Sequence, residues 1–429
     1  MNATVRTELD LSEATALELD AADALTTSRD RFEMPLGPDG EPAIYFCGHS
    51  LGPLPRAART TVDEELDAWS RLGIGGHFRE QVPWFTYAEL LAEATARVVG
   101  ALPVEVVTMN ALSVNLHLLL ASFYRPTNER YRVLMEAGAF PSDRYAMASH
   151  LRSRGVNPAE AIRLVKPRAG EATLRTEDVE ARIAEEGSRL ALVWLPGLQY
   201  LTGQRLDIER ITAAGAATGS VVGWDLAHAA GNVPLRLHDW GVDFAVWCTY
   251  KYMNAGPGSI GQAFVHERWA RDVDLPRYAG WWGNDPETRF AFSAEFEPRD
   301  GAAGWQISNP PILALAPLRA SLAIFDEIGM DAIRARSERL TAYLESLLDS
   351  MGIGEQITPR DPAARGAQLS FRIGDRAQLV EQELAQRGAV IDFREPDVIR
   401  FAPAPLYNTF HEAWRFANLL SEVLEEKAQ

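Results

Sequence analysis

Lysine is rare in this chain, and that rarity draws attention to one position. Lys166, Lys251 and Lys427 are the only lysines among 42 basic residues, and the others are arginines. Arginine stays protonated at any useful pH, whereas a desolvated lysine can be neutral and attack a carbonyl carbon. Lys251 lies in WCTYKYMNAGPGSIG, with aromatic residues before it and glycines after it. We therefore take Lys251 as the candidate nucleophile.

The surroundings of Lys251 match what pyridoxal phosphate requires of a protein. That cofactor needs a lysine for its aldehyde, a carboxylate for its pyridine nitrogen, a cover for its ring and donors for its phosphate. Asp225 and His228 close the strand-like run SVVGW, and Lys251 comes 26 residues after Asp225, beyond one more strand. This spacing places a carboxylate and an amine at neighbouring strand ends. A lone Asp at a strand end would otherwise be interpreted as a helix cap.

The phosphate and the ring have weaker signals. Leu112 and Ser113 open a predicted helix directly after the strand-like VEVVTM, and free amides at a helix start suit a phosphate. Phe140 and Asp143 follow the strand-like YRVLMEA, and Phe140 could stack on the pyridine ring. Tyr250, next to the lysine, could donate to the phosphate and transfer a proton.

Other kinds of site are poorly supported. Gly48-His49-Ser50-Leu51-Gly52 matches the nucleophile elbow of serine hydrolases, but Pro53 and Pro55 follow where that elbow needs a helix. The eight histidines contain no H-E-x-x-H or other close ligand pair, so we expect no metal site. No G-x-G-x-x-G fingerprint of a dinucleotide site lies between a strand and a helix.

The elements that must position these residues alternate between strands and helices. Strand-like runs at 190–195, 220–225, 242–248 and 260–266 are apolar on both faces, and helical patterns at about 176–186 and 207–218 separate the earlier ones. This order predicts an α/β fold with a mostly parallel sheet between helices, where ligands bind at the carboxyl ends of the strands. Residues 1–55 are predicted to form an N-terminal arm and substrate loop, 56–312 a large domain, and 313–429 a smaller α+β domain.

Composition narrows the class of protein. The net charge of −17 argues against binding to nucleic acid or to an anionic membrane. Two cysteines cannot form a disulfide framework, and no stretch approaches the roughly 20 apolar residues of a membrane helix. The acidic N-terminal residues do not fit a signal peptide. These features predict a cytoplasmic protein.

Eight stretches together resemble kynureninase, a pyridoxal-phosphate family of fold type I in the aspartate aminotransferase superfamily. They are YFCGHSLGPL (45–54), MNALSVNLHLL (109–119), FPSDRY (140–145), WDLAHAAGNV (224–233), HDWGVDFA (238–245), YKYMNAGPG (250–258), ISNPPI (307–312) and IRFAPAPLYN (399–408). The resemblance implies hydrolytic cleavage of the Cβ–Cγ bond of L-kynurenine, 3-hydroxy-L-kynurenine or both, in tryptophan catabolism and the kynurenine pathway to NAD. It also implies a homodimer.

The resemblance assigns roles to individual residues. Lys251 would bind the cofactor aldehyde and act in catalysis with Tyr250 and Asp225. Arg400 would bind the substrate α-carboxylate, with His77, Ser50 and Asn309 also contacting substrate. The implied cofactor contacts are Leu112, Ser113, Phe140, Asp143, Asp225, His228, Tyr250, Lys251, Trp281 and Asn309, with Trp281 and Asn309 near a subunit boundary.

Two positions depart from the family pattern. The family usually has Asn at His49, and at Pro196 it usually has a Ser or Thr hydroxyl, which proline cannot replace. We therefore assign Pro196 no binding role. His77 with Ser308-Asn309 is more similar to the animal-type enzymes, which favour 3-hydroxykynurenine.

Several alternatives stay open from the sequence. A cysteine desulfurase, a β-lyase or an aminotransferase could share the Asp225 and Lys251 pair. A desulfurase also needs a mobile cysteine, whereas Cys47 and Cys248 both lie in apolar runs typical of buried positions. A kynureninase-like enzyme for a ring-substituted kynurenine in a biosynthetic pathway, and a scaffold without turnover, are the remaining alternatives.

Overall fold

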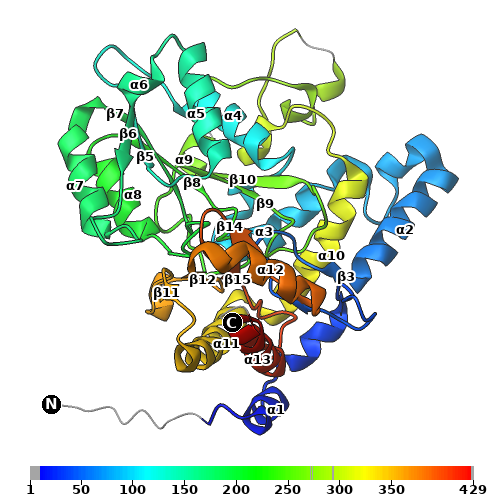
Figure 1. Cartoon of the computed structure of the whole chain (residues 1–429). Helices are drawn as coiled ribbons and strands as arrows, with labels where there is room; N and C mark the ends of the chain where they lie inside the picture. Colours follow the sequence, from blue (N-terminus) through cyan, green and yellow to red (C-terminus); the bar gives the residue numbers. More distant parts are fainter. Residues whose placement is uncertain (1–9, 271, 273, 292–293, 427–429) are drawn as a thin grey trace.

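A seven-stranded sheet forms the centre of the protein (Figure 1). The computed structural model describes residues 10–270, 272, 274–291 and 294–426. The strands lie in the order β4-β10-β9-β8-β7-β5-β6, and all are parallel except β10, which is antiparallel to β4 and β9. Their bounds are β4 Val106–Thr108, β5 Arg132–Glu136, β6 Ile162–Val165, β7 Leu190–Pro196, β8 Val221–Asp225, β9 Phe244–Cys248 and β10 Gly261–Val265.

Helices cover both faces of this sheet. Neighbouring residues of a strand belong to different hydrophobic clusters: on β5, Val133 packs in one cluster and Leu134 in the other. This alternation follows from the period of two along a strand, which sends successive side chains to opposite faces. The helices on the Val133 face are α4 (Leu112–Phe123) and α5 (Pro141–Ser153), and those on the Leu134 face are α3 (Ala92–Val99), α7 (Thr176–Glu186), α8 (Ile208–Ala217) and α10 (Ile312–Ile328).

A second, smaller sheet lies in the C-terminal part of the chain. Its four strands are antiparallel in the order β11-β12-β15-β14, and a third hydrophobic cluster fills the space between this sheet and its helices. The strands are β11 (Glu355–Gln356), β12 (Leu369–Arg372), β14 (Asp392–Arg394) and β15 (Val398–Phe401), and the helices are α11 (Met330–Met351), α12 (Ala377–Gln386) and α13 (Phe410–Glu426).

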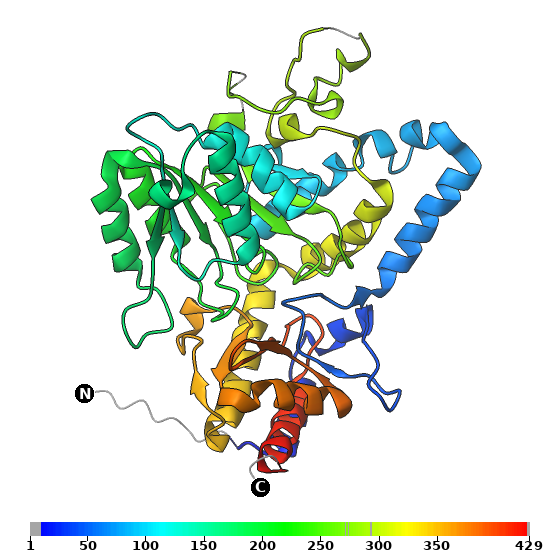
Figure 2. The ribbon, with the colours of Figure 1, turned by 45° about the horizontal axis from the view of Figure 1, so that its top comes forward.

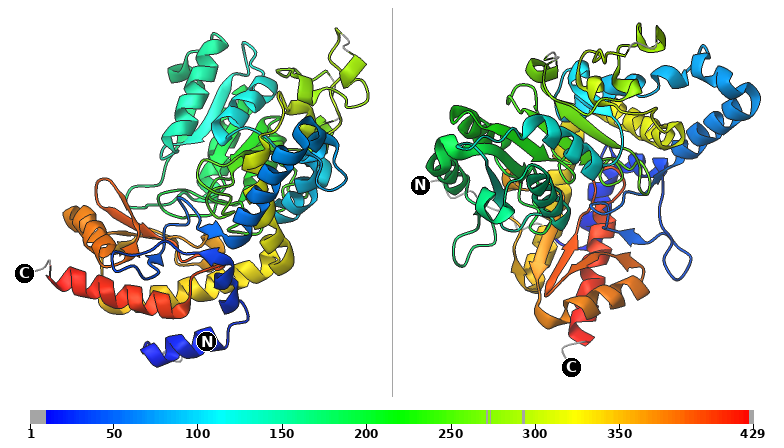
Figure 3. Two further views of the ribbon diagram at one scale, coloured as in Figure 1. Left: turned by 90° about the vertical axis from the view of Figure 1, so that its right-hand side faces the viewer. Right: turned by 90° about the horizontal axis from the view of Figure 1, so that it is seen from above.

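The N-terminal segment joins the smaller unit rather than standing apart. Helix α1 (Glu13–Ala21) packs against α13, as Figure 3 shows. Strand β2 (Ile44–Tyr45) pairs in parallel with β13 (Ala389–Val390). Helix α2 (Arg56–Leu72) then packs against α10, and its C-terminal end projects from the body of the molecule (Figure 2). Residues near the start of the chain are thereby held beside residues near its end.

The predicted fold class is confirmed, with additions. The helices expected at about 176–186 and 207–218 are α7 and α8, and the expected strands are β7, β8, β9 and β10. Edge strand β6 and the short strands β11, β13 and β14 were not predicted, because their few residues carry too little periodicity. Within the described ranges, no helix combines the length and apolar character that crossing a membrane requires.

Candidate active site

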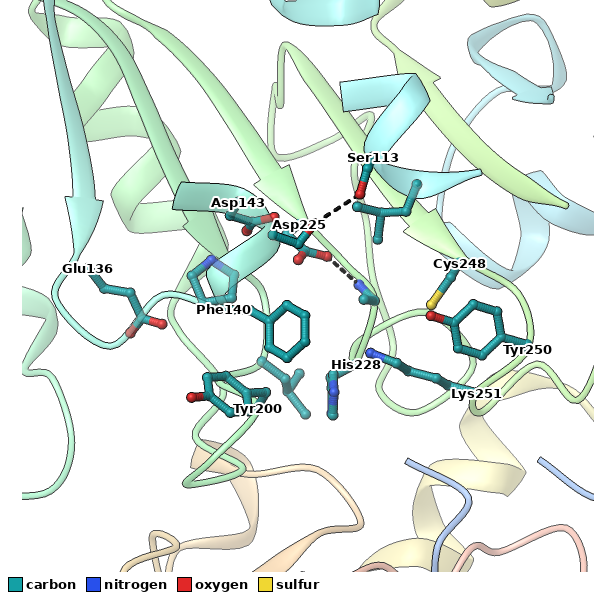
Figure 4. Close-up of a pocket in the computed structure, with 15 residues that line it drawn as sticks. Ser113, Glu136, Phe140, Asp143, Tyr200, Asp225, His228, Cys248, Tyr250 and Lys251 are labelled. Carbon is teal, nitrogen blue, oxygen red and sulfur yellow. Dashed lines mark hydrogen bonds between the residues drawn. The ribbon is translucent and has the colours of Figure 1, made fainter. Parts of the chain in front are cut away.

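A cavity opens at the carboxyl ends of the parallel strands (Figure 4). Its volume is about 90 Å³. Eight residues predicted from the sequence line it. They are Leu112, Ser113, Phe140, Asp143, Asp225, His228, Tyr250 and Lys251.

The sheet register brings the cavity residues together. Asp225 is the last residue of β8 and is the register partner of Pro196 on β7 and of Val246 on β9. Strand β9 ends at Cys248, and Lys251 follows three residues later. Parallel neighbours end at the same edge of a sheet, so the Asp225 carboxylate and the Lys251 amine face one cavity.

The side-chain amine of Lys251 has no hydrogen-bond or ion-pair partner within the described part of the chain, while its backbone carbonyl accepts from the Asn254 amide at 3.0 Å. The positive charge of Lys251 acts on two neighbours: it opposes the burial that raises the pKa of Asp225, and it adds to the burial that lowers the pKa of His228. The pKa of His228 lies well below its usual value, chiefly because the residue is buried. His228 is therefore neutral, and no side chain of the described residues holds the Lys251 amine away from the cavity.

Two buried carboxyl groups lie at the floor of the cavity. Burial raises the pKa of Asp143 well above its usual value, and the nearby charge of Asp225 raises it further. Burial also raises the pKa of Asp225, against the hydrogen bond that it accepts from the Ala227 amide at 2.8 Å and the charge of Lys251. Because Asp225 has these stabilising partners, we assign the negative charge to Asp225 and the proton to Asp143. Asp143 Oδ1 is buried without a partner in the described part of the chain.

Glu136 is a cavity residue that the sequence analysis missed. It is the last residue of β5, and Gln199 donates to its carboxyl group at 3.4 Å. Burial raises its pKa to about 7, and the charge of Asp225 adds to that rise. The sequence could have indicated Glu136, because it is an acidic residue that directly follows the apolar run VLM. A charged residue at the carboxyl end of a buried strand is uncommon outside functional sites.

The start of α4 forms the other end of the cavity. No side chain caps this helix at Ala111, so its first amides are available to an anion. The hydroxyl groups of Ser113 and Ser142 lie 2.9 Å apart at this position. The ring of Phe140 is 43% exposed in the cavity and packs edge-on against Tyr200, with 5.2 Å between the ring centroids.

Arg400 lies behind the cavity rather than in its wall. Its guanidinium is buried, donates to the carboxylate of Asp392 and to the backbone carbonyl of Tyr200, and lies over the Tyr200 ring. Tyr200 itself lines the cavity, so this one residue separates Arg400 from it. Burial lowers the pKa of Arg400 to about 10, and Arg400 remains charged at neutral pH.

Four predicted site residues lie away from the cavity in the single chain. Ser50 is exposed in the turn after β2, and Asn309 is exposed before α10. His77 packs edge-on against Trp84, 5.4 Å away between centroids. Trp281 is 45% exposed and donates to the Arg289 carbonyl at 3.1 Å. Their roles in binding stay predictions.

The remaining motifs have structural explanations. The Gly48–Gly52 segment is a turn, and the next helix begins only at Arg56, so it is not a nucleophile elbow. Pro196 lines the cavity, although proline offers no donor. Cys248 also lines the cavity but is buried, while burial raises the pKa of Cys47 to about 11, so neither is a ready nucleophile.

Glu105, His238 and His266 come together from distant parts of the sequence. Glu105 accepts from His238 Nδ1 at 2.9 Å and from the amides of Leu102 and Glu267, both at 2.9 Å. The two imidazoles stack, with centroids 5.0 Å apart. Because the carboxylate already accepts from these three donors, we interpret this cluster as a hydrogen-bonded contact between loops.

The residues of the cavity fit pyridoxal phosphate. A free amine, a charged buried carboxylate and an exposed aromatic face surround one space, and uncapped helix amides with two hydroxyl groups lie at its other end. The unpartnered Asp143 Oδ1 provides a further buried polar atom for a ligand.

Comparisons with known proteins agree with this fit. Residues 333–420 match the family described as the kynureninase C-terminal domain. The chain is 55% identical over 411 residues to a kynureninase of Myxococcus xanthus, covering 95% of this chain and 96% of that protein. A kynureninase of Salinispora tropica is 53% identical over 425 residues, covering 97% and 99%.

Solved structures support the fold. A mutant of the cystine C–S lyase C-DES with glycine covalently linked to its PLP cofactor superposes with a TM-score of 0.76 at 18% identity, covering 91% of this chain and 98% of that one. The cysteine desulfurase CsdA from Escherichia coli gives a TM-score of 0.75 at 16% identity, covering 93% and 98%. At these identities the likeness concerns the fold alone.

Proposed function

The chain belongs to the kynureninase family, and we propose that it hydrolyses the Cβ–Cγ bond of L-kynurenine or 3-hydroxy-L-kynurenine. The products are L-alanine and anthranilate or its 3-hydroxy form. The enzyme is a hydrolase that acts on a carbon–carbon bond and depends on pyridoxal phosphate. The observation that carries the proposal is the meeting of the unpaired Lys251 amine and the charged Asp225 at one cavity.

Bound pyridoxal phosphate supplies an electrophilic aldehyde and a ring that accepts electrons from the bonds being broken. Lys251 Nζ would hold that aldehyde, and its amine would take the Cα proton of the substrate. Asp225 would pair with the ring nitrogen and keep it protonated. The neutral carboxyl of Asp143 accepts from Trp194 at 3.1 Å, which fixes its orientation beside Asp225.

Three further residues would contact the cofactor or the substrate. Phe140 would cover the ring, and Tyr250 Oη would hold the proton that is exchanged with the substrate γ-carbonyl oxygen as water adds there. Burial and the neighbouring Cys248 raise the pKa of Tyr250, so its hydroxyl stays protonated at neutral pH and acts first as a donor. Arg400 binds the substrate α-carboxylate.

We also propose a homodimer in which a partner covers an exposed apolar patch. The patch consists of Trp69, Leu72, Ile74 and Phe78 at the end of α2, whose exposures range from 46% to 80%. Exposed apolar groups concentrated in this way are typical of interaction surfaces. Trp281 and Phe290 are 45% and 52% exposed. Phe290 lies near the patch, because its ring stacks on Phe85 and Phe85 stacks on Phe78. In such a dimer, Trp281 and Asn309 of one subunit would lie close to the cavity of the other subunit.

We place the enzyme in tryptophan catabolism, on the route from kynurenine toward NAD, and in the cytoplasm. The location rests on Cys47 and Cys248, which are unpaired thiols as expected in a reducing compartment.

The decisive experiment follows fluorescence of the released anthranilate when the purified enzyme is mixed with L-kynurenine. The parallel assay follows loss of absorbance with 3-hydroxy-L-kynurenine. Lys251→Arg should lose the visible absorption band of the bound cofactor and fall at least 1,000-fold in kcat, since an arginine cannot bind the aldehyde reversibly. Wild-type protein without turnover of either substrate would contradict the proposal, as would a Lys251→Arg variant with more than a tenth of wild-type activity.

A further inference from the structure

Arg400 has a carboxylate partner that is built into the same small sheet. Strands β14 and β15 are antiparallel, and their register places Asp392 directly opposite Arg400. Arg400 Nη2 donates to Asp392 Oδ2 across the two strands. Because both residues are anchored in a hydrogen-bonded ladder, the backbone keeps the two side chains opposite each other.

The charges around Asp392 leave one positive charge in excess. Arg394 Nε lies 3.1 Å and His49 Nε2 lies 3.4 Å from the same oxygen, Asp392 Oδ2. His49 is completely buried, and burial together with the nearby cations holds its pKa well below the usual value, so it is neutral. Two guanidinium groups therefore share one carboxylate, and a single added anion would balance the cluster.

One donor of Arg400 is engaged by a cavity residue, and another has no partner. Nη1 donates to the carbonyl of Tyr200, which also accepts from Gln368 at 2.9 Å. Arg400 Nε is buried and has no partner within the described residues. Nη2 is thus held by Asp392 and Nη1 by the carbonyl of Tyr200, a residue that lines the cavity, which leaves Nε for a further acceptor.

We propose that Asp392 is a positioning residue that orients Arg400 for the α-carboxylate of the substrate, and that the cluster's single excess charge favours an amino acid with one carboxylate there. This inference rests on the proposed function, in which Arg400 binds that group. Asp392 does not touch the substrate. It acts by holding one edge of a planar donor fork, whose geometry decides how well a carboxylate is bound.

The test compares Asp392→Asn with Asp397→Asn. Asp397 lies in the hairpin that joins β14 to β15 and pairs with Arg372 Nε at 3.3 Å, so its variant removes a carboxylate from the same sheet without touching Arg400. In Asp392→Asn we expect KM for L-kynurenine to rise about 10- to 100-fold, as for loss of a hydrogen bond to a charged group, with kcat within threefold of wild type. Asp397→Asn should stay within twofold of wild type in both constants.

A substrate analogue without the carboxylate separates positioning from general damage. Kynuramine, which is kynurenine lacking its α-carboxylate, should inhibit wild type and Asp392→Asn with equal inhibition constants. A KM for kynurenine that is unchanged or lower in Asp392→Asn would refute the inference, as would an equal loss of affinity for kynuramine.

A second variant keeps the test decisive if Asp392→Asn does not fold. Asp392→Glu retains the charge but moves the carboxylate by one methylene, and it should raise KM for kynurenine at least threefold without changing the inhibition constant of kynuramine. Equal values for both ligands in wild type and Asp392→Glu would overturn the inference. Absence of turnover in the wild type would instead overturn the proposed function.

Discussion

Glu136 makes the stability of this protein depend on pH in a direction opposite to that of most carboxyl groups. Its folded-state pKa is about 7, against an ordinary value of 4.5. As pH rises, the unfolded chain therefore releases this proton first, and the folded state loses stability between those two values. Above about pH 7 both states are ionised and the loss is complete.

The size of the effect follows from the two pKa values. Each unit of difference corresponds to about 1.4 kcal/mol, and integration from pH 5 to pH 8 gives about 2.5 kcal/mol for Glu136 alone. Glu136→Gln has no proton to lose, while its amide oxygen can still accept from Gln199. Relative to wild type, the variant should therefore gain about 2.5 kcal/mol of unfolding free energy on going from pH 5 to pH 8.

The assay is urea unfolding of wild type and Glu136→Gln at pH 5 and pH 8, followed by fluorescence at one protein and one cofactor concentration. The difference between the two proteins cancels every other titrating group. Glu129→Gln, at an exposed glutamate, is the control and should show no difference between the two pH values. The reasoning would be refuted if the unfolding free energies of wild type and Glu136→Gln differed by the same amount at pH 5 and pH 8. That result would mean that Glu136 is already ionised in the folded protein at pH 5.

Two other predictions concern packing and assembly. Gly48→Ala should lower the unfolding free energy by about 1–3 kcal/mol, because the added Cβ overlaps the buried hydroxyl of Tyr407. Urea unfolding should show most of that loss restored by Tyr407→Phe in the same chain, and a double variant no better than Gly48→Ala would contradict the packing argument. Phe78→Glu should convert the proposed dimer into a monomer in sedimentation velocity, whereas Leu36→Glu, at an equally exposed leucine, should not. A dimer that survives Phe78→Glu would move the interface away from the patch.

The cavity residues near Lys251 could be predicted because their positions depend on local pattern and on one topological rule. Asp225, Asp143 and Phe140 each follow a buried strand, and the carboxyl ends of parallel strands share one edge of a sheet. Glu136 follows the same rule and was missed, because one acidic residue at the end of a short apolar run is a weak signal without its neighbours.

Residues that reach the site through long-range packing could not be placed in this way. Arg400 lies in the small sheet, and its contact with Tyr200 joins residues 200 positions apart. Its partner Asp392 becomes visible only through the register of β14 against β15. A single chain does not bring His77, Trp281 and Asn309 into the cavity, and these residues lie at its surface instead.

The fold class, the family and the pair Asp225 and Lys251 could be inferred from the order of residues alone, because strand periodicity and motif spacing are local properties. The folded chain was needed to establish which buried group keeps its proton, which carboxylate holds Arg400, and which predicted residues lie outside the cavity. Those outcomes depend on desolvation and on distances between segments that are remote in the chain, and neither quantity is encoded in residue spacing.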